Sequence, residues 1–262
     1  MTSSLQLRAI HLRVADLQRS VAFYRDQLGL HLSVQDGPNA SLTTTTGALP
    51  ALHLTEDRSA KPAPRDAAGL FHAALLLPTR SALGSWLRST ADAGVKFDGF
   101  SDHGVSEAIY LSDPDGNGLE VYVDRPRAQW PFHNGELQMV TEPLALPELL
   151  SVGASHEGSP LNGASWGHLH LRVSSLDRSQ EFYSSALGVV LTQRFGDSAR
   201  FLAADGYHHH LGLNRWGGVN QPQPPGGLGL MKATFARAGI ALENTLKDPD
   251  GISIQLTPGK ET

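Results

Sequence analysis

Three side chains suited to acid–base or ligand chemistry, His103, Tyr110 and Glu120, share the segment HGVSEAIYLSDPDGNGLEVY at 103–122. Its DPDG sequence at 113–116 predicts a turn, because proline presets φ and glycine accepts a positive φ. The apolar stretches on either side would be the arms of a hairpin, with Tyr110 and Glu120 close together on neighbouring strands. A glutamate flanked by apolar residues is costly to bury without a compensating cation. Glu120 therefore either binds a cation or faces water at a sheet edge, and this segment alone favours neither.

The composition limits how a cation could be bound. The chain has 262 residues and no cysteine, but it has twelve histidines. Disulfides, thiolate metal sites and cysteine nucleophiles are excluded. Any metal must be held by histidine and carboxylate side chains.

Length and charge indicate the class of protein. The chain is long enough for two domains with their own cores. Its net charge of −5, without a basic cluster, argues against nucleic acid as a partner. No stretch approaches about eighteen consecutive apolar residues, and the first four residues lack the pattern of a signal peptide. We expect a cytoplasmic protein without membrane contact, and a homo-oligomer is compatible with the sequence.

An internal repeat organises the chain. HLRVADLQRSVAFYRDQLGLHLSVQ at 11–35 and HLRVSSLDRSQEFYSSALGVVLTQR at 170–194 share twelve of 25 positions at a constant offset of 159. A repeat of this kind reflects a repeated structural unit. Each copy predicts a strand, then a helix that begins after a capping residue and ends at glycine, then a strand.

A second type of unit follows the first copy. The apolar strand at 69–78, a helix at 81–94 and the hairpin complete it. The tail of the chain echoes this unit in shortened form: 229–240 reads as its helix, and NQPQPPGG at 220–227 replaces its opening strand. The prediction is an α+β fold of four βαβββ modules, the fourth eroded. We expect an N-terminal half at 1–125, a connector at 126–165 with a short helix in LALPELLSV, and a C-terminal half at 166–262.

The repeat and the hairpin together resemble the vicinal oxygen chelate superfamily of glyoxalases, bleomycin resistance proteins and extradiol dioxygenases. Its members pair βαβββ modules into cupped half-barrels around a divalent metal. The pattern H-x5-I-Y-x2-D-P-x-G-x3-E is similar to the signature of extradiol ring-cleavage dioxygenases, and Ser101 departs from the residue types that it prefers. The pattern is filled by His103, Ile109, Tyr110, Asp113, Pro114, Gly116 and Glu120. The whole chain most resembles two-domain catechol 2,3-dioxygenase-like proteins.

The resemblance implies roles for these residues. Glu120 would be the carboxylate of a 2-His-1-carboxylate site for Fe(II), with Mn(II) as the substitute. His72, on the apolar strand of the same module, would be a second ligand. Tyr110 would bind an oxygen of the substrate, and His103 would shape the pocket wall. The alternative for His72 is a core histidine bonded to a backbone carbonyl.

The third ligand depends on how the modules pair. Sequential pairing would supply His11, with His53 as a base or fourth ligand. Nested pairing, of modules two and three, would supply His170. We favour nested pairing, because DGYHHHLGLNRW at 205–216 resembles the strand that carries the acid–base histidine of extradiol enzymes, with His210 in the matching place. The predicted ligands are thus His72, Glu120 and His170, and the predicted catalytic residues are His210, Tyr110 and His103.

Several neighbouring residues leave alternatives open. His168 points to the same face as His170 and is a second candidate for that ligand. Strand alternation puts His208 and His210 on one face and His209 on the other. Trp166, Trp216 and Tyr207 would line the pocket or fill the core. The predicted partners are a small aromatic diol and O2. The rival functions are a glyoxalase-type isomerase or lyase and a metal-free binding module that sequesters small molecules.

Overall fold

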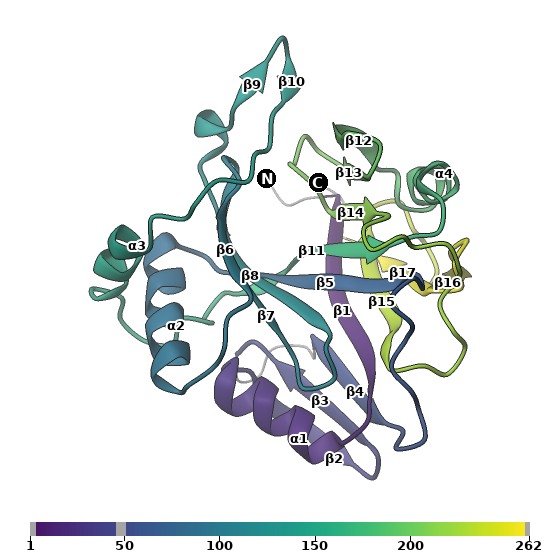
Figure 1. Cartoon of the computed structure of the whole chain (residues 1–262), viewed down its shortest axis with the longest axis horizontal. Helices are drawn as coiled ribbons and strands as arrows, with labels where there is room; N and C mark the ends of the chain where they lie inside the picture. Colours follow the sequence, from purple (N-terminus) through teal and green to yellow (C-terminus); the bar gives the residue numbers. More distant parts are fainter. Residues whose placement is uncertain (1–3, 46–50, 260–262) are drawn as a thin grey trace.

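The computed structural model describes residues 4–45 and 51–259, which form two curled β-sheets with helices on their outer sides (Figure 1). Residues 1–3, on which the expectation of no signal peptide partly rests, lie outside the described residues. One apolar core, with Leu12, Leu75 and Phe235 among its fully buried members, takes residues from both sheets. In the described ranges, no helix has the length and apolar character needed to cross a membrane. The α+β half-barrel fold is confirmed.

The eight-stranded sheet joins modules two and three. Its strands, in order, are β12 (Val190–Phe195), β13 (Ala199–Ala203), β14 (Leu211–Asn214), β11 (Ser165–Arg172), β5 (Gly69–Leu76), β8 (Gly118–Asp124), β7 (Ser106–Ser112) and β6 (Gly99–Asp102). The opening strands of the two modules, β5 and β11, pair antiparallel at the centre. Nested pairing is therefore confirmed.

The seven-stranded sheet joins modules one and four. Its strands, in order, are β16 (Asn244–Lys247), β17 (Ser253–Pro258), β15 (Gly229–Arg237), β1 (Leu5–Val14), β4 (Leu52–Glu56), β3 (Asn39–Thr43) and β2 (His31–Asp36). Each sheet thus takes strands from both sides of the predicted connector. The predicted division into halves at 1–125 and 166–262 stays a prediction. Neither half alone contains all the strands of a sheet.

The sequence predicted that module four lacks its opening strand, but the structure differs at this point. The segment read as its helix is the strand β15, which pairs antiparallel with β1. Leu230, Ala233 and Phe235 of this strand are fully buried, whereas Lys232 and Thr234 between them are partly exposed. Its helix-favouring composition was misleading, because β1 offers an unpaired strand edge that recruits it. Module four keeps its opening strand and lacks a helix among the described residues.

The repeated helices form as predicted. Asp16 caps α1 (Leu17–Ala22) by accepting a hydrogen bond from the Arg19 amide at 2.9 Å, and the helix continues as a π-helical turn, η1 (Phe23–Gln27). In the second copy Ser175 caps α4 (Leu176–Leu187), and Gly188 ends it with φ of 71°. A left-handed residue at this position is the usual reason for glycine after a helix.

The connector packs on module two. It contains η2 (Arg127–Gln129), a short ribbon of β9 (Phe132–His133) and β10 (Glu136–Leu137) that projects from the body in Figure 1, and α3 (Leu146–Gly153). Helix α3 lies on α2 (Arg80–Asp92), and a Cβ atom added to Gly84 would come within 2.1 Å of the Leu149 carbonyl oxygen. Glycine at this crossing therefore allows the two helices to touch.

Candidate active site

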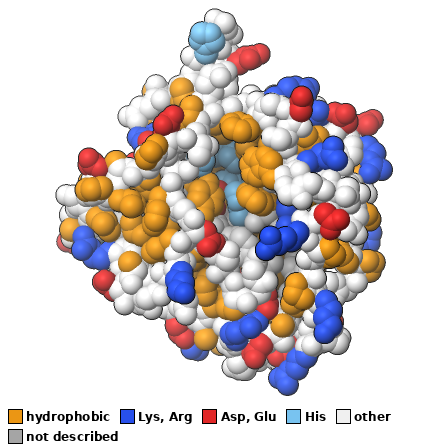
Figure 2. All heavy atoms as spheres, in the orientation of Figure 1, with side chains coloured by type: hydrophobic (Ala, Val, Ile, Leu, Met, Phe, Trp, Pro, Cys, Tyr) orange, Lys and Arg blue, Asp and Glu red, His pale blue; other side chains and the backbone are white. Residues whose placement is uncertain are grey.

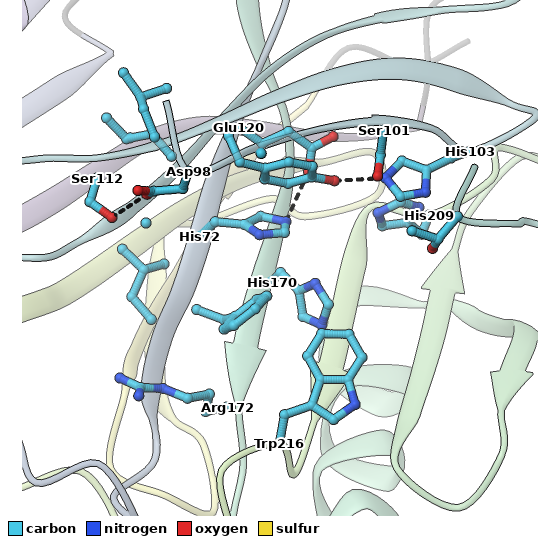
Figure 3. Close-up of a pocket in the computed structure, with 18 of the residues that line it drawn as sticks. His72, Asp98, Ser101, His103, Ser112, Glu120, His170, Arg172, His209 and Trp216 are labelled. Carbon is cyan, nitrogen blue, oxygen red and sulfur yellow. Dashed lines mark hydrogen bonds and ion pairs between the residues drawn. The ribbon is translucent and has the colours of Figure 1, made fainter. Parts of the chain in front are cut away.

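All of the predicted site residues except His210 line a cavity of about 580 Å³ in the eight-stranded sheet. In Figure 2 this hollow lies near the centre of the face, with histidine side chains at its floor and apolar side chains around its rim. Figure 3 shows His103 and His209 on one side of Glu120 and His72, with His170 and Trp216 on another. Of the three predicted lining aromatics, Trp216 is the one that borders this cavity.

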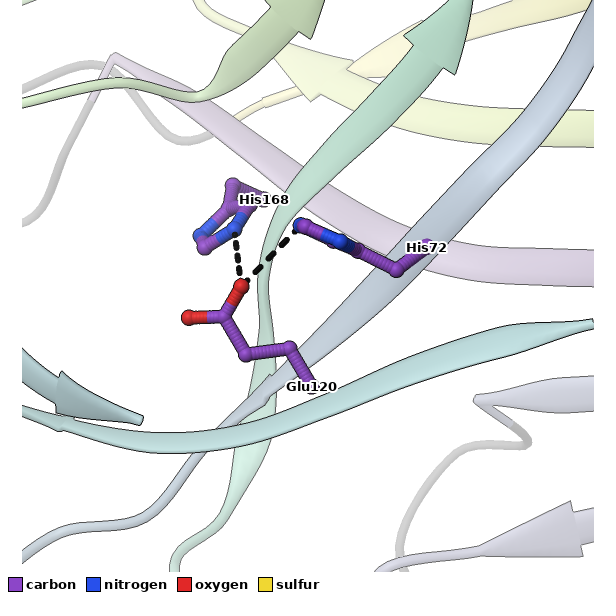
Figure 4. Close-up of side chains that lie close together, drawn as sticks. All are labelled: His72, Glu120 and His168. Carbon is purple, nitrogen blue, oxygen red and sulfur yellow. Dashed lines mark hydrogen bonds and ion pairs between the residues drawn. The ribbon is translucent and has the colours of Figure 1, made fainter. Parts of the chain in front are cut away.

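Three buried ligand-type side chains converge at its inner end: His72 from β5, Glu120 from β8 and His168 from β11 (Figure 4). Both histidine Nε2 atoms approach the same carboxylate oxygen, Oε2 of Glu120, at 3.0 Å for His72 and 3.2 Å for His168. One ligand atom from each residue lies within 4.8 Å of the others. All three residues are at most 6% exposed.

Strand register explains why these three side chains meet. Ala74 of β5 pairs with Glu120 on one side and with His168 on the other. The small side chain of Ala74 leaves room above it, and His72, two residues earlier on the same face, reaches into that space. The cluster therefore depends on three adjacent strands from two modules.

The donor set of this cluster fits a divalent metal. Within the described part of the chain, the buried Nε2 of His72 makes no hydrogen bond, and its contact with Glu120 Oε2 at 3.0 Å is an ion-pair approach. Burial opposes charge on Glu120, but the His168 and His72 imidazoles outweigh it and hold the pKa of the Glu120 carboxyl well below its usual value. Burial also keeps the pKa of His168 below its usual value, despite the nearby Glu120. A carboxylate and two imidazole nitrogens directed at one point form the three-residue face that non-haem Fe(II) sites use.

His170, predicted as the third ligand, is not part of this cluster. Its ring centre lies 4.8 Å from that of His72, but its Nε2 accepts a hydrogen bond from the Asn214 side-chain amide at 3.0 Å. Its strand partner is His72, which lies two residues along β5 from Ala74, the partner of Glu120. The repeat made His170 the equivalent of His11, and the sequence could not show which of His168 and His170 lies beside the carboxylate. In the structure His168 lies beside Glu120.

Tyr110 and His103 lie where the hairpin predicts. Tyr110 pairs with Glu120 across β7 and β8, and both line the cavity. The Nδ1 of His103 lies 2.7 Å from the Val140 carbonyl oxygen, so this nitrogen carries the proton. The Nε2 of His103 then accepts a hydrogen bond from the Tyr110 hydroxyl at 2.7 Å. Burial, reinforced by the Glu120 carboxylate, raises the pKa of Tyr110 well above its usual value and keeps it a phenol.

His210, predicted as the acid–base residue, faces away from this cavity. Its Nδ1 accepts a hydrogen bond from the Ala204 amide at 3.2 Å, and its side chain lines a second cavity. His209 borders the active-site cavity instead, and its ring centre lies 4.1 Å from that of His168. Burial, with His168 and His208 nearby, holds the pKa of His209 well below its usual value. The predicted alternation of faces along this segment is correct, but the face assigned to the pocket is the wrong one.

Behind His209 lies a chain of hydrogen bonds that the sequence did not indicate. The Asp124 carboxylate accepts from His208 Nε2 at 2.8 Å, and Nδ1 of His208 lies 2.7 Å from Nδ1 of His209. Tyr207 also donates to Asp124, at 3.0 Å. Tyr207 and Trp166, expected as pocket aromatics, border the second cavity rather than this one.

Comparison with known proteins agrees with this geometry. Residues 6–121 match the sequence model of the Glyoxalase/Bleomycin resistance protein/Dioxygenase superfamily. The chain is 41% identical over 218 residues to a catechol-2,3-dioxygenase of Bacillus subtilis, an alignment that covers 82% of this chain and 76% of that protein. The chain belongs to this superfamily.

A further curated protein and two solved structures are also similar to the chain. A biphenyl-2,3-diol 1,2-dioxygenase of Rhodococcus globerulus is 26% identical over 189 residues, which cover 68% of this chain and 98% of that protein. A crystal structure of a putative dioxygenase from Bacillus subtilis superposes with a TM-score of 0.62 at 13% identity, covering 98% of this chain and 86% of that one. Glyoxalase I from Zea mays superposes with a TM-score of 0.56 at 18% identity, covering 97% and 92%.

The superfamily's alternative ligand set is not assembled in this chain. His11 and His53 lie in the seven-stranded sheet, whereas His72 and Glu120 lie in the eight-stranded one. His11 Nε2 lies 2.8 Å from the Thr55 hydroxyl, and His53 Nδ1 lies 2.9 Å from that of Ser41. The four-residue set expected for a glyoxalase-type site, with His11 and His53 joining His72 and Glu120, is therefore divided between two sheets.

Proposed function

We propose that the protein is an extradiol ring-cleavage dioxygenase that opens a catechol with O2 at a non-haem Fe(II) centre, with Mn(II) as a substitute metal. The metal would be held by His72, Glu120 and His168. The observation that carries this proposal is the buried cluster of these three residues, two of which, His72 and Glu120, line the same cavity as the Tyr110–His103 pair and His209. Its partners would be a small aromatic diol and O2, in the cytoplasm.

The metal would supply Lewis acidity and open coordination positions at which a diol and O2 can be held side by side. His72, Glu120 and His168 would hold the metal, and the cavity that His72 and Glu120 line would give the substrates access to it. The charge of the bound cation would be compensated in part by the Glu120 carboxylate. The remaining positive charge favours a catechol that has lost one or both hydroxyl protons.

His209 would accept a proton from a substrate hydroxyl and later return it. Its depressed pKa keeps it a neutral base near neutral pH, and it borders the cavity beside His168. General acid–base catalysis by a positioned side chain contributes roughly 10²–10⁴ in rate. The Tyr110 hydroxyl would orient an oxygen of the substrate, with His103 fixing the direction of its hydrogen bond.

The cavity suits a single substituted aromatic ring. Phe71, Phe201 and Trp216 line it, and their rings surround His170 at centre-to-centre distances of 5.0, 5.8 and 5.4 Å. Aromatic walls favour an aromatic substrate through offset and edge-to-face contacts. Its volume of about 580 Å³ lies within the range of small-ligand pockets.

Anaerobic reconstitution with Fe(II), followed by O2 uptake on catechol, tests the proposal. We expect one iron per chain, O2 consumption and a yellow ring-cleavage product, all of them lost in His72→Ala. Conversion of the methylglyoxal–glutathione adduct without turnover of a panel of catechols would instead establish the isomerase. Tight binding of an aromatic ligand by a protein that retains no metal would establish the sequestering function.

A further inference from the structure

The second half-barrel has a cavity of its own, of about 1050 Å³, which no residue of the proposed active site lines. It lies against β1, β4, β15 and β17 and the first residues of β11. Its volume is comparable with that of the larger pockets that hold small ligands, roughly 300–1,000 Å³. A cavity of this size next to a second sheet is a candidate site in its own right.

The strand registers identify which residues of the seven-stranded sheet occupy the positions that His72, Glu120 and His168 hold in the eight-stranded sheet. Lys232 pairs with His11 across β15 and β1, just as His72 pairs with His170 across β5 and β11. Two residues further on, Thr234 pairs with both Ala9 and Gln255. The substitutions are therefore Lys232 for His72, Gln255 for Glu120 and Ala9 for His168. A cation replaces a metal ligand, and the negative charge is gone.

The charge of Lys232 is not compensated within the cavity. Among the described residues, no hydrogen bond or ion pair reaches the Lys232 ammonium group, which is partly buried. The described lining includes Arg8 and Arg127 as well, and no aspartate or glutamate. Glu243 contacts the Gln255 side-chain amide, but it is exposed and does not line the cavity. A local excess of positive charge in a chain of net charge −5 marks this cavity as a site for anions.

The surroundings of Lys232 are part polar and part apolar. Thr234 and Gln255 beside it are hydrogen-bonded to each other at 3.0 Å. Burial, and then the charge of Lys232, lowers the pKa of His53, so this ring remains a neutral hydrogen-bonding group. Leu7 and Leu76 provide apolar wall on the other strands. A ligand with one anionic head and an apolar body matches this lining.

We propose that the second half-barrel is a binding site for a small organic carboxylate, whose carboxylate group pairs with Lys232 and whose apolar body lies against Leu7 and Leu76. The charge-assisted pair supplies the direction of binding, because a carboxylate next to an ammonium forms a stronger hydrogen bond than a neutral group does. The site is separate from the catechol cavity and does not require the proposed dioxygenase activity.

Calorimetric titration of the metal-loaded protein with benzoate, and with benzamide as the uncharged analogue, tests the site. We expect benzoate to bind and benzamide to bind at least tenfold more weakly. Lys232→Met should weaken benzoate binding by about 10- to 100-fold, the range expected when a charged hydrogen bond is lost. Lys96→Met, which removes an exposed lysine elsewhere, should leave it unchanged. Lys232→Arg keeps the charge and should retain binding.

Circular dichroism checks that each variant is folded, and Lys232→Gln replaces the methionine variant if that one is not. Equal affinity for benzoate and benzamide would overturn the proposal, as would benzoate binding that survives loss of the Lys232 charge. Absence of benzoate binding to the unaltered protein at millimolar concentration would overturn it too. O2 uptake on catechol is a separate readout, so failure of this site and failure of the proposed activity are distinguishable.

Discussion

The Nδ1 atoms of His208 and His209 lie 2.7 Å apart, and this contact determines which nitrogen of His209 carries its proton. The Asp124 carboxylate can only accept, so Nε2 of His208 carries the proton that it shares with Asp124. With its proton on Nε2, His208 offers Nδ1 as an acceptor, and Nδ1 of His209 donates to it. The remaining nitrogen of His209, Nε2, is left unprotonated, which is the form that a general base requires.

Asp124→Asn should therefore slow turnover without removing the metal. An asparagine amide that donates to His208 Nε2 reverses both tautomers and places the proton of His209 on Nε2. We expect kcat to fall by about 10- to 100-fold, within the range for a displaced general base, with KM nearly unchanged. Nitrogen-15 chemical shifts of the histidine rings report the tautomers directly. Tyr207→Phe, which removes the other donor to Asp124, is the matched control and should leave the tautomers as they are.

Substitutions of the adjacent residues His209 and His210 test which of the two is the acid–base residue. His209→Asn should leave the metal bound and lower kcat by roughly 10²–10⁴, because the proposed acid–base group is lost. His210→Asn should leave kcat within about a factor of three, since this side chain lines the other cavity. Iron content and steady-state O2 uptake measure both effects. A larger loss of rate in His210→Asn than in His209→Asn would return the acid–base role to the residue that the sequence favoured.

The close contact between α2 and α3 at Gly84 predicts that a larger residue there lowers the free energy of unfolding. Gly84→Ala places a methyl group within 2.1 Å of the Leu149 carbonyl oxygen, so the helices must separate. Overpacking of this kind costs typically about 1–3 kcal/mol in the free energy of unfolding. Urea denaturation should show a lower midpoint for Gly84→Ala and an unchanged one for Asp92→Ala, an exposed position at the end of the same helix. Equal midpoints would mean that α3 moves away freely.

Much of the architecture followed from local patterns in the sequence. The repeat at offset 159 identified the module boundaries, and the DPDG turn fixed the register that places Tyr110 opposite Glu120. The pairing of modules two and three was predicted from the histidine-rich segment at 205–216, which belongs to module three. These features are local or repeated, so a single sequence carries them.

The predictions that differ from the structure have a common physical cause, because they depended on contacts between distant strands. The segment at 229–237 has good helix formers, and only the free edge of β1 makes it a strand. His168 and His170 share a face, and only their register against Ala74 and Glu120 separates them. A usable signal existed in the repeat. Module one has Ala9 where module three has His168. A histidine that differs between the two copies is a candidate for a role that only one copy has, whereas His170 has its equivalent in His11.

Metal binding separates these two histidines experimentally. His168→Ala removes one of three converging donors and leaves Glu120 with a single imidazole, so iron affinity should fall by at least about 100-fold. His170→Ala removes a ring that accepts from Asn214 and should lower iron affinity by less than about tenfold. Titration of the metal-free protein with Fe(II), or with Mn(II) followed by electron paramagnetic resonance, measures both affinities without relying on turnover. His11→Ala, in the other sheet, is the control and should bind metal normally. Metal lost from His170→Ala and kept by His168→Ala would restore the ligand set predicted from the sequence and would require β11 to shift by two residues against β5.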